Sequence, residues 1–239
     1  AAMVTCLDDQ VGRVVAALEQ KGIRDNTLIV FQSDNGGTFD ATFTGVMADV
    51  SQVRIPCDNG PYRDGKGNLY EGGTRVAAFA NWPGHIPAGT RVNEVIHVVD
   101  LFTTLTTLAG ASTSRCKPLD GLNVWGAIAE GKPSPRTEVV YNLEPYRAGI
   151  RQGDWKLIWR TILPSKVELF NLASDPSEKT NLAATHPDKV AALQQRANEL
   201  AQGAAKPLFL VEQFKVVMKN MQGEPVLPGE DGFDSGDLP

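Results

Sequence analysis

The first residues of the chain have the apolar spacing of an amphipathic helix. Apolar residues recur at intervals of three and four, at Val4, Leu7, Val11, Val14 and Leu18. One face of a helix repeats at this interval, and Lys21 followed by Gly22 is typical of a helix end. No capping side chain stands before this run. We therefore expect a helix ending near residue 20, and we expect that residue 1 is not the natural start of the protein.

Three apolar runs of strand length follow this helix. They cover residues 27–33, 76–82 and 92–99. A mostly apolar run of this length, such as 27–33, fits a strand buried on both faces, as in a parallel sheet. Asp100 can cap a further helix over 101–108. This part of the chain therefore predicts an α/β fold, with a mixed or parallel sheet between helices.

Shorter apolar runs follow residue 110. The candidate strands cover 139–143, 148–151, 155–160 and 167–172. A second amphipathic helix is marked by Val190, Leu193, Ala197 and Leu200. These elements predict a small antiparallel sheet subdomain with one helix.

Composition and charge exclude several classes of protein. Of 239 residues, 23 are Lys or Arg, 28 are Asp or Glu, and 42% are hydrophobic. This chain is too apolar to be disordered, and its net charge of −5 argues against a nucleic-acid binder. No run reaches the roughly 18 apolar residues of a membrane helix. Residues 222–239 carry the whole net charge, so we expect an acidic tail behind a neutral body.

Two polar segments are candidates for chemistry. Ser33-Asp34-Asn35-Gly36-Gly37 follows the first apolar run, and its side chains are hard oxygen donors of the kind that Ca²⁺ or Mg²⁺ prefers. The alternative is an ordinary Asp-Asn-Gly turn. Lys66 lies between two glycines, where its ammonium could serve an anion as a point charge. The alternative for this second segment is a solvated loop.

Together, and in this order, the two segments resemble the sulfatase family of the alkaline-phosphatase superfamily, with the closest likeness to arylsulfatase B-like enzymes. Five later segments also match the family: 118–122, 131–136, 150–157, 168–172 and 175–178. The resemblance implies part of the catalytic α/β domain over 1–115 and a small α+β subdomain over 116–210. The remaining residues, 211–239, form the Gly- and Pro-rich acidic tail.

The resemblance implies a role for several residues. Asp34 and Asn35 match two ligands of the family's divalent cation, Ca²⁺ or Mg²⁺, and Lys66 matches a lysine that contacts the sulfate ester. A cation and an ammonium would stabilise charge developing on sulfuryl oxygens. We interpret Glu71 and Arg75 as a structural pair. We interpret His97 as a core histidine and His85 as a surface residue. Four further residues are interpreted as packing and hairpin support, with a substrate rim as the alternative: Arg147, Arg151, Trp155 and Trp159.

The nucleophile motif of sulfatases is missing from the sequence. Sulfatases use a formylglycine made from the Cys or Ser of Cys-x-Pro-x-Arg, and the nearest approach, Cys116-Lys-Pro-Leu-Asp120, ends in Asp. The family's early Asp-Asp metal pair is missing as well. We therefore expect the C-terminal half of a sulfatase, inactive without an N-terminal half that carries the formylglycine. An uncovered sheet edge should make it associate with that half or with itself.

The function expected from these features is sulfuric ester hydrolysis, on an aryl sulfate or a sulfated sugar. Two alternatives stay open at this point. One is a phosphate or phosphonate ester hydrolase of the same superfamily, and the other is a non-catalytic module derived from a sulfatase. The family resemblance alone suggests a periplasmic, secreted or lysosome-like location.

Overall fold

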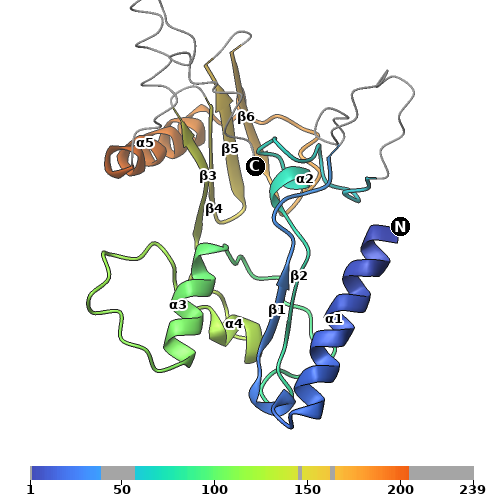
Figure 1. Cartoon of the computed structure of the whole chain (residues 1–239). Coiled ribbons are helices and arrows are strands. Elements are labelled where there is room, and N and C mark those ends of the chain that lie inside the picture. Colours follow the sequence, from blue (N-terminus) through green and yellow to red (C-terminus); the bar gives the residue numbers. More distant parts are fainter. Residues whose placement is uncertain (1, 39–56, 145–146, 162–164, 205–239) are drawn as a thin grey trace, which may run out of the picture.

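The first helix and strand confirm the pattern of the opening residues. A computed structural model describes residues 2–38, 57–144, 147–161 and 165–204 (Figure 1). Helix α1 (Ala2–Gln20) is followed by the 3₁₀ turn η1 (Arg24–Asn26) and strand β1 (Ile29–Gln32). Gly22 ends the helix with a left-handed φ of 66°, which glycine adopts without steric cost. No helix within these described ranges is both long and apolar enough to span a bilayer.

Strand β1 pairs with β2 (Ala78–Asn81) in an antiparallel, two-stranded sheet. Ile29 lies opposite Asn81, and Gln32 lies opposite Ala78. The prediction of parallel strands buried on both faces is wrong for this pair, because 39% of Val30 and 64% of Phe79 are exposed. An apolar run indicates that a strand is suited to burial, but it does not indicate which part of the protein covers the strand.

The third predicted strand does not form. Residues 92–98 are irregular and lead into helix α3 (Val99–Leu108). Side chains take the backbone groups that a sheet would pair: Ser134 Oγ donates to the Val95 carbonyl at 2.7 Å, and the His97 amide donates to Asp100 Oδ2 at 2.8 Å. Asp100 therefore lies in the first turn of α3 and bonds the backbone before it, where we expected a cap of a helix starting at 101.

A buried ion pair fixes α3 to the residues before the second sheet. Asp100 is 0% exposed. Arg136 Nε donates to its Oδ2 at 2.7 Å, and Arg136 Nη2 donates to its Oδ1. Burial raises the pKa of Asp100, but hydrogen bonds from Arg136 and from the Leu122 and His97 amides outweigh it, so its pKa lies below the ordinary value. The matching segment 131–136 thus has a structural role here.

The predicted antiparallel sheet is confirmed, with strand order β3-β4-β5-β6. After the short helix α4 (Trp125–Ala129), the strands are β3 (Glu138–Glu144), β4 (Arg147–Gln152), β5 (Trp155–Arg160) and β6 (Lys166–Asn171). Each pairs with the next in the chain, and a bulge interrupts β3 between Val140 and Asn142. The helix that follows, α5 (Pro187–Gly203), also confirms its apolar spacing.

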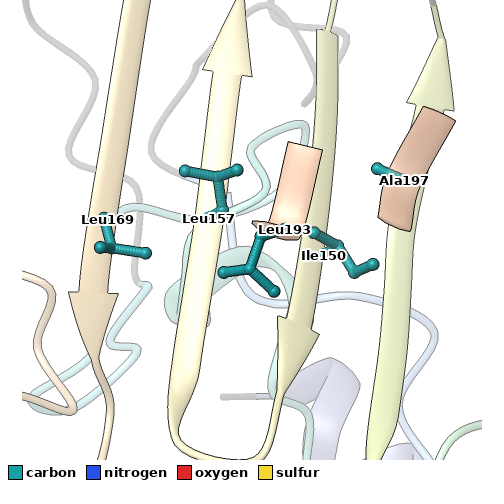
Figure 2. Close-up of a cluster of buried hydrophobic side chains, with 5 residues drawn as sticks. All are labelled: Ile150, Leu157, Leu169, Leu193 and Ala197. Carbon is teal, nitrogen blue, oxygen red and sulfur yellow. The ribbon is translucent and has the colours of Figure 1, made fainter. Parts of the chain in front are cut away.

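Different segments cover the two faces of this sheet. On one face, Ile150, Leu157 and Leu169 pack with two residues of α5, Leu193 and Ala197, as Figure 2 shows. On the other face, Ile158, Phe170 and Leu172 of the sheet region pack with Leu69 and Tyr70. The segment that carries Lys66 is therefore the cover of the second face, and the sheet positions it. The expected tail over 211–239 lies outside the described residues.

Candidate functional site

The Asp34-Asn35 turn continues directly from the end of β1. The Ser33 amide donates to the Ala77 carbonyl at 3.0 Å, extending the pairing with the segment before β2. The Asn35 amide donates to Asp34 Oδ1 at 3.0 Å, and Asn35 Nδ2 donates to the Gly36 carbonyl at 2.8 Å. Asp34 is exposed and Asn35 is half-buried. Two oxygen-bearing side chains thus stand next to each other at the carboxyl end of a strand.

Backbone hydrogen bonds join this turn to the Lys66 loop. The Lys66 amide donates to the Gly37 carbonyl at 3.0 Å, and the Gly36 amide donates to the Gly73 carbonyl at 3.1 Å. Asn59 holds the same junction, because its Oδ1 accepts from the Gly37 amide at 2.9 Å and its Nδ2 donates to the Asp64 carbonyl at 2.8 Å. The structure therefore brings the two candidate segments together. Asn59 was missed, although it belongs to a second Asp-Asn-Gly triplet at 58–60.

Three glycines allow these backbones to approach closely. A Cβ on Gly36 would lie 1.7 Å from the Gly72 carbonyl oxygen, and a Cβ on Gly72 would lie 2.0 Å from the Asp64 oxygen. A Cβ on Gly73 would lie 2.4 Å from the Asn68 oxygen. Because every obstacle is backbone, no side-chain rearrangement can make room. We call this set of contacts, of Gly36 with Gly72 and Gly73 and of these two glycines with the 63–68 backbone, the glycine junction.

A buried ionic cluster lies behind the junction. Lys156 on β5 is 0% exposed, and its Nζ lies 2.8 Å from Glu71 Oε1 and 3.0 Å from Glu178 Oε1. Glu178 also accepts a hydrogen bond of 2.6 Å from the Glu71 amide through its Oε2. The ammonium lies 4.4 Å from the centre of the Tyr141 ring. This cluster fastens helix α2 (Glu71–Thr74), which closes the Lys66 loop, to the four-stranded sheet.

Burial in this cluster shifts the pKa of Glu178. Burial raises the pKa of Glu178 above its ordinary value, in spite of the opposing ammonium of Lys156. The expected Glu71–Arg75 pair is present, with 3.7 Å between Glu71 Oε2 and Arg75 Nη1. Lys156 is the nearer partner of Glu71, and the sequence interpretation missed it.

A second group of charged residues lies around Tyr70. The Arg63 guanidinium lies 3.9 Å from the centre of the Tyr70 ring, and its Nη1 lies 3.2 Å from Glu168 Oε1. The Tyr70 hydroxyl donates to Glu168 Oε2. Burial, and then the neighbouring Glu168 carboxylate, raise the pKa of Tyr70 to about 12. Arg63 Nη1 also donates to the Glu178 carbonyl at 3.0 Å, which joins this group to the buried cluster.

Of the other candidates from the sequence, one contacts the Lys66 loop and the rest lie in the packed core or on the surface. His97 is half-buried and accepts the Val99 amide through Nδ1 at 3.2 Å, while His85 is exposed. Trp155 and Trp159 pack against the core under α5, so they support the sheet. Arg147 differs from these, because its Nη1 donates to the Gly67 carbonyl at 2.8 Å. It therefore contacts the loop directly beside Lys66.

Few described groups around the Asp34-Asn35 turn could complete a metal site. Within the described ranges, no group of three or more His, Cys, Asp or Glu side chains is arranged to hold a metal ion. The assignment of Asp34 and Asn35 as cation ligands stays a prediction.

Comparison with protein families identifies the fold that carries this junction. Residues 1–111 match the sulfatase family, and residues 62–205 match the C-terminal region of N-sulphoglucosamine sulphohydrolase. The chain belongs to the sulfatase family. Both matches include the Lys66 loop and the glycines of α2. The second match also covers the four-stranded sheet.

Individual relatives give the same result over part of their length. Mouse (Mus musculus) arylsulfatase J is 27% identical over 246 residues, covering 83% of this chain and 39% of that protein. Pig (Sus scrofa) N-acetylgalactosamine-6-sulfatase is 38% identical over 135 residues, covering 56% of this chain and 24% of that protein. This sulfatase chain thus spans well under half the length of both relatives.

The fold is similar to that of solved sulfatase structures. The structure of Ps i-CgsB in complex with k-i-k-neocarrahexaose has a TM-score of 0.73 and 30% sequence identity. The match covers 93% of this chain and 47% of that chain. The expected fold class, an alkaline-phosphatase-like α/β fold with a small antiparallel subdomain, is confirmed at this level.

Proposed function

We propose that this chain forms part of the active site of a sulfuric ester hydrolase. In this site, Lys66 contacts the sulfate group, and Asp34 and Asn35 bind a divalent cation. The hydrogen bond of 3.0 Å from the Lys66 amide to the Gly37 carbonyl carries the proposal, because it fixes the backbone of a cationic residue to a position two residues away from Asn35. Membership of the sulfatase family supports the reaction class.

The donors of the Asp34-Asn35 turn suit a hard cation. Carboxylate and amide oxygens are the ligands that Ca²⁺ and Mg²⁺ prefer. Asn35 Nδ2 is engaged with the Gly36 carbonyl, so the amide oxygen is the atom of this side chain that remains for a cation. Ca²⁺ takes roughly six to eight oxygen ligands, so the other ligands come from elsewhere in the protein. When bound, such a cation polarises an oxygen of the sulfate ester.

Lys66 is suited to bind the anion because its backbone is fixed and its side chain is exposed. A preorganised ammonium stabilises charge that develops on sulfate oxygens, since little reorganisation is needed during the reaction. We propose, from the family resemblance, that a formylglycine is the nucleophile. No Cys-x-Pro-x-Arg occurs in this sequence, so no residue of this chain is assigned to that role. The proposed substrate is a sulfate ester of an aryl or sugar alcohol.

The experiment compares sulfate release by the natural protein that contains these residues with release by its Lys66→Ala variant. We expect a loss of about 10²–10³ in kcat, the usual effect of removing one preorganised group that stabilises charge. Lys189→Ala is the control, because Lys189 lies on α5, which packs on the opposite face of the four-stranded sheet. The 239-residue chain alone should show no turnover above its own Lys66→Ala variant.

A second measurement tests the cation site through thermal stability, independently of enzymatic activity. Asp34→Asn should reduce the rise in thermal unfolding temperature that Ca²⁺ gives the natural protein, because bound ligands stabilise the folded state. If sulfate release is unaffected by Lys66→Ala, the proposed function is wrong. Hydrolysis of phosphonate or phosphate esters in place of sulfate esters would favour the superfamily alternative. Ligand binding without turnover of any ester would favour a non-catalytic module.

We also propose that the apolar face of α1 contacts another polypeptide. Met3 is 88% exposed, Val4 70%, Leu7 50% and Val14 57%. Aligned apolar side chains with this exposure are typical of interaction surfaces. The partner is either the remaining part of a sulfatase fold or a second copy of this chain.

The oligomeric state of the 239-residue chain tests this surface. Sedimentation velocity should show self-association that Val14→Glu reduces, because the substitution puts a charge on the apolar face. Ala16→Glu adds the same charge at an exposed position on the opposite side of the helix and should have no effect. The proposal is contradicted if the chain is monomeric at all concentrations and does not bind the remaining part of the natural protein.

A further inference from the structure

One end of the four-stranded sheet carries three cations in a single cross-strand row. Arg147 on β4 lies directly opposite Arg160 on β5, and Arg160 lies directly opposite Lys166 on β6. Directly opposite residues have Cβ atoms about 4.5–5.5 Å apart, and like charges in such pairs destabilise a sheet. A row of this kind therefore needs a source of negative charge. We call these three residues the basic row.

The basic row is on the face that the Lys66 segment covers. Side chains alternate between the faces of a strand, so Arg160 shares a face with Ile158, and Lys166 shares one with Phe170. Ile158 and Phe170 pack with Leu69 and Tyr70 of the Lys66 segment. The hydrogen bond of 2.8 Å from Arg147 Nη1 to the Gly67 carbonyl then fixes one end of the row next to Lys66.

The described residues supply little negative charge to the row. Lys166 Nζ lies 2.8 Å from Glu168 Oε1, but Arg63 and the Tyr70 hydroxyl use the same carboxylate. Arg147 and Arg160 form no ion pair with any described residue. Arg147 Nε is buried and has no hydrogen-bond partner there.

Glu144 is a second carboxylate at this end of the sheet among the residues that the structure describes. It lies opposite Arg147, and its Oε2 accepts a hydrogen bond of 2.9 Å from Asn142 Nδ2. The basic row thus brings Arg147, Arg160 and Lys166 together, and the described carboxylates opposite or beside them are Glu144 and Glu168. Among the described residues, positive charge is therefore in excess along this row, although the chain as a whole carries a net charge of −5.

We propose that Arg147 and Arg160 bind a second anionic group of the substrate, a sulfate or carboxylate on a neighbouring sugar residue. The inference rests on the proposed function, because it takes Lys66 as the contact of the sulfate that is cleaved. Guanidinium groups bind sulfate-like and carboxylate oxygens through two parallel hydrogen bonds, which a point charge cannot do. The carbonyl that anchors Arg147 belongs to Gly67, the residue after Lys66, and on this proposal both anions are groups of one oligosaccharide. The substrate class is thus a polyanionic saccharide in preference to a small aryl sulfate.

The test measures the preference of the natural protein between two substrates. These are an oligosaccharide with several sulfate groups and a nitrophenyl sulfate with one. Arg160→Gln should lower the ratio of kcat/KM for the oligosaccharide to kcat/KM for the nitrophenyl sulfate by about tenfold to hundredfold, mainly through KM. Arg160 is exposed, so the substitution should not prevent folding. The control, Arg91→Gln, changes an exposed arginine in the loop before α3.

Arg147→Lys separates bidentate recognition from charge alone. It keeps the positive charge and should still lower the ratio, because an ammonium cannot form the paired hydrogen bonds of a guanidinium. The decrease in this ratio caused by Arg160→Gln should also be smaller at high salt, because salt screens the charge that contributes to oligosaccharide binding. An unchanged ratio in Arg160→Gln would overturn the proposal.

A direct binding measurement with the same oligosaccharide distinguishes failure of this proposal from failure of the proposed function. Calorimetry on the natural protein should show a loss of affinity in Arg160→Gln that Arg91→Gln does not share. If the protein binds the oligosaccharide through Arg160 but releases sulfate from neither substrate, the proposed function fails and the polyanion site stands. If sulfate is released and Arg160→Gln alters neither binding nor the ratio, the polyanion site fails and the proposed function stands.

Discussion

Replacement of Lys156 by methionine is expected to destabilise the folded chain by about 3–5 kcal/mol at pH 7. Methionine fills a similar volume, so the main effect is the loss of the ammonium that lies 2.8 Å from Glu71 and 3.0 Å from Glu178. Removing one partner of a buried ion pair leaves uncompensated charge in a site that water cannot reach. Here two carboxylates would remain together. Urea unfolding of the 239-residue chain, followed by circular dichroism, measures the difference.

The pH dependence distinguishes lost charge from lost packing. The pKa of Glu178 already lies above its ordinary value in the folded protein, and loss of Lys156 should raise it further. A group whose folded pKa is raised stabilises the protein below its unfolded pKa, about 4.3 for glutamate, and this stabilisation is lost as the pH rises through the folded pKa. The loss of unfolding free energy in the Lys156→Met variant should therefore be largest near pH 7 and should decrease toward pH 4. A deficit that does not change with pH would contradict the electrostatic explanation.

Two further variants serve as controls for Lys156. Lys189→Met removes an exposed lysine from α5 and should change stability by less than about 0.5 kcal/mol. The triple variant K156M/E71Q/E178Q should recover part of the loss, because amides carry no charge that burial penalises. Lys156 thus determines whether α2, and with it the Lys66 loop, remains fastened to the sheet.

The elements predicted well from the sequence are those whose evidence is local. Helix α1, strands β3–β6 and helix α5 each show their periodicity within one short window, and each forms close to its predicted position. The run at 92–99 failed because Ser134 and Asp100 take its backbone groups. Periodicity contains no information about such partners. The antiparallel pairing of β1 with β2 was hidden for the same reason.

The candidate site shows the same division. Adjacent oxygen donors at 34–35 and a glycine-flanked lysine at 66 can be recognised in the sequence, and the structure places their loops in contact. Lys156 could not be recognised, because a lysine among strand residues usually faces solvent and its partners are distant. Glu71 and Glu178 themselves are 107 residues apart. A buried cluster becomes visible only when the fold brings such residues together.

Substitution of Gly72 by alanine is expected to reduce stability by about 4–5 kcal/mol, or to prevent folding of the glycine junction altogether. The new Cβ would lie 2.0 Å from the Asp64 carbonyl oxygen and 2.4 Å from the Arg63 carbonyl oxygen. Since both obstacles are backbone, the chain must separate at the hydrogen bond of 2.8 Å from the Gly72 amide to the Arg63 carbonyl. The free energy of unfolding in urea measures the loss.

Gly12→Ala is the matched control, because a Cβ on Gly12 would meet nothing within 4 Å. Gly12 lies inside α1, where alanine should stabilise the helix by about 0.5–1 kcal/mol, so the two substitutions should have opposite signs. Hydrogen exchange then locates the damage in any Gly72→Ala protein that folds. The Lys66 amide, bonded to the Gly37 carbonyl, should lose protection, whereas amides of β4 and β5 should keep theirs. If Lys66 stayed protected in that variant, the close backbone contact would not be what holds the loop against the Asp34-Asn35 turn.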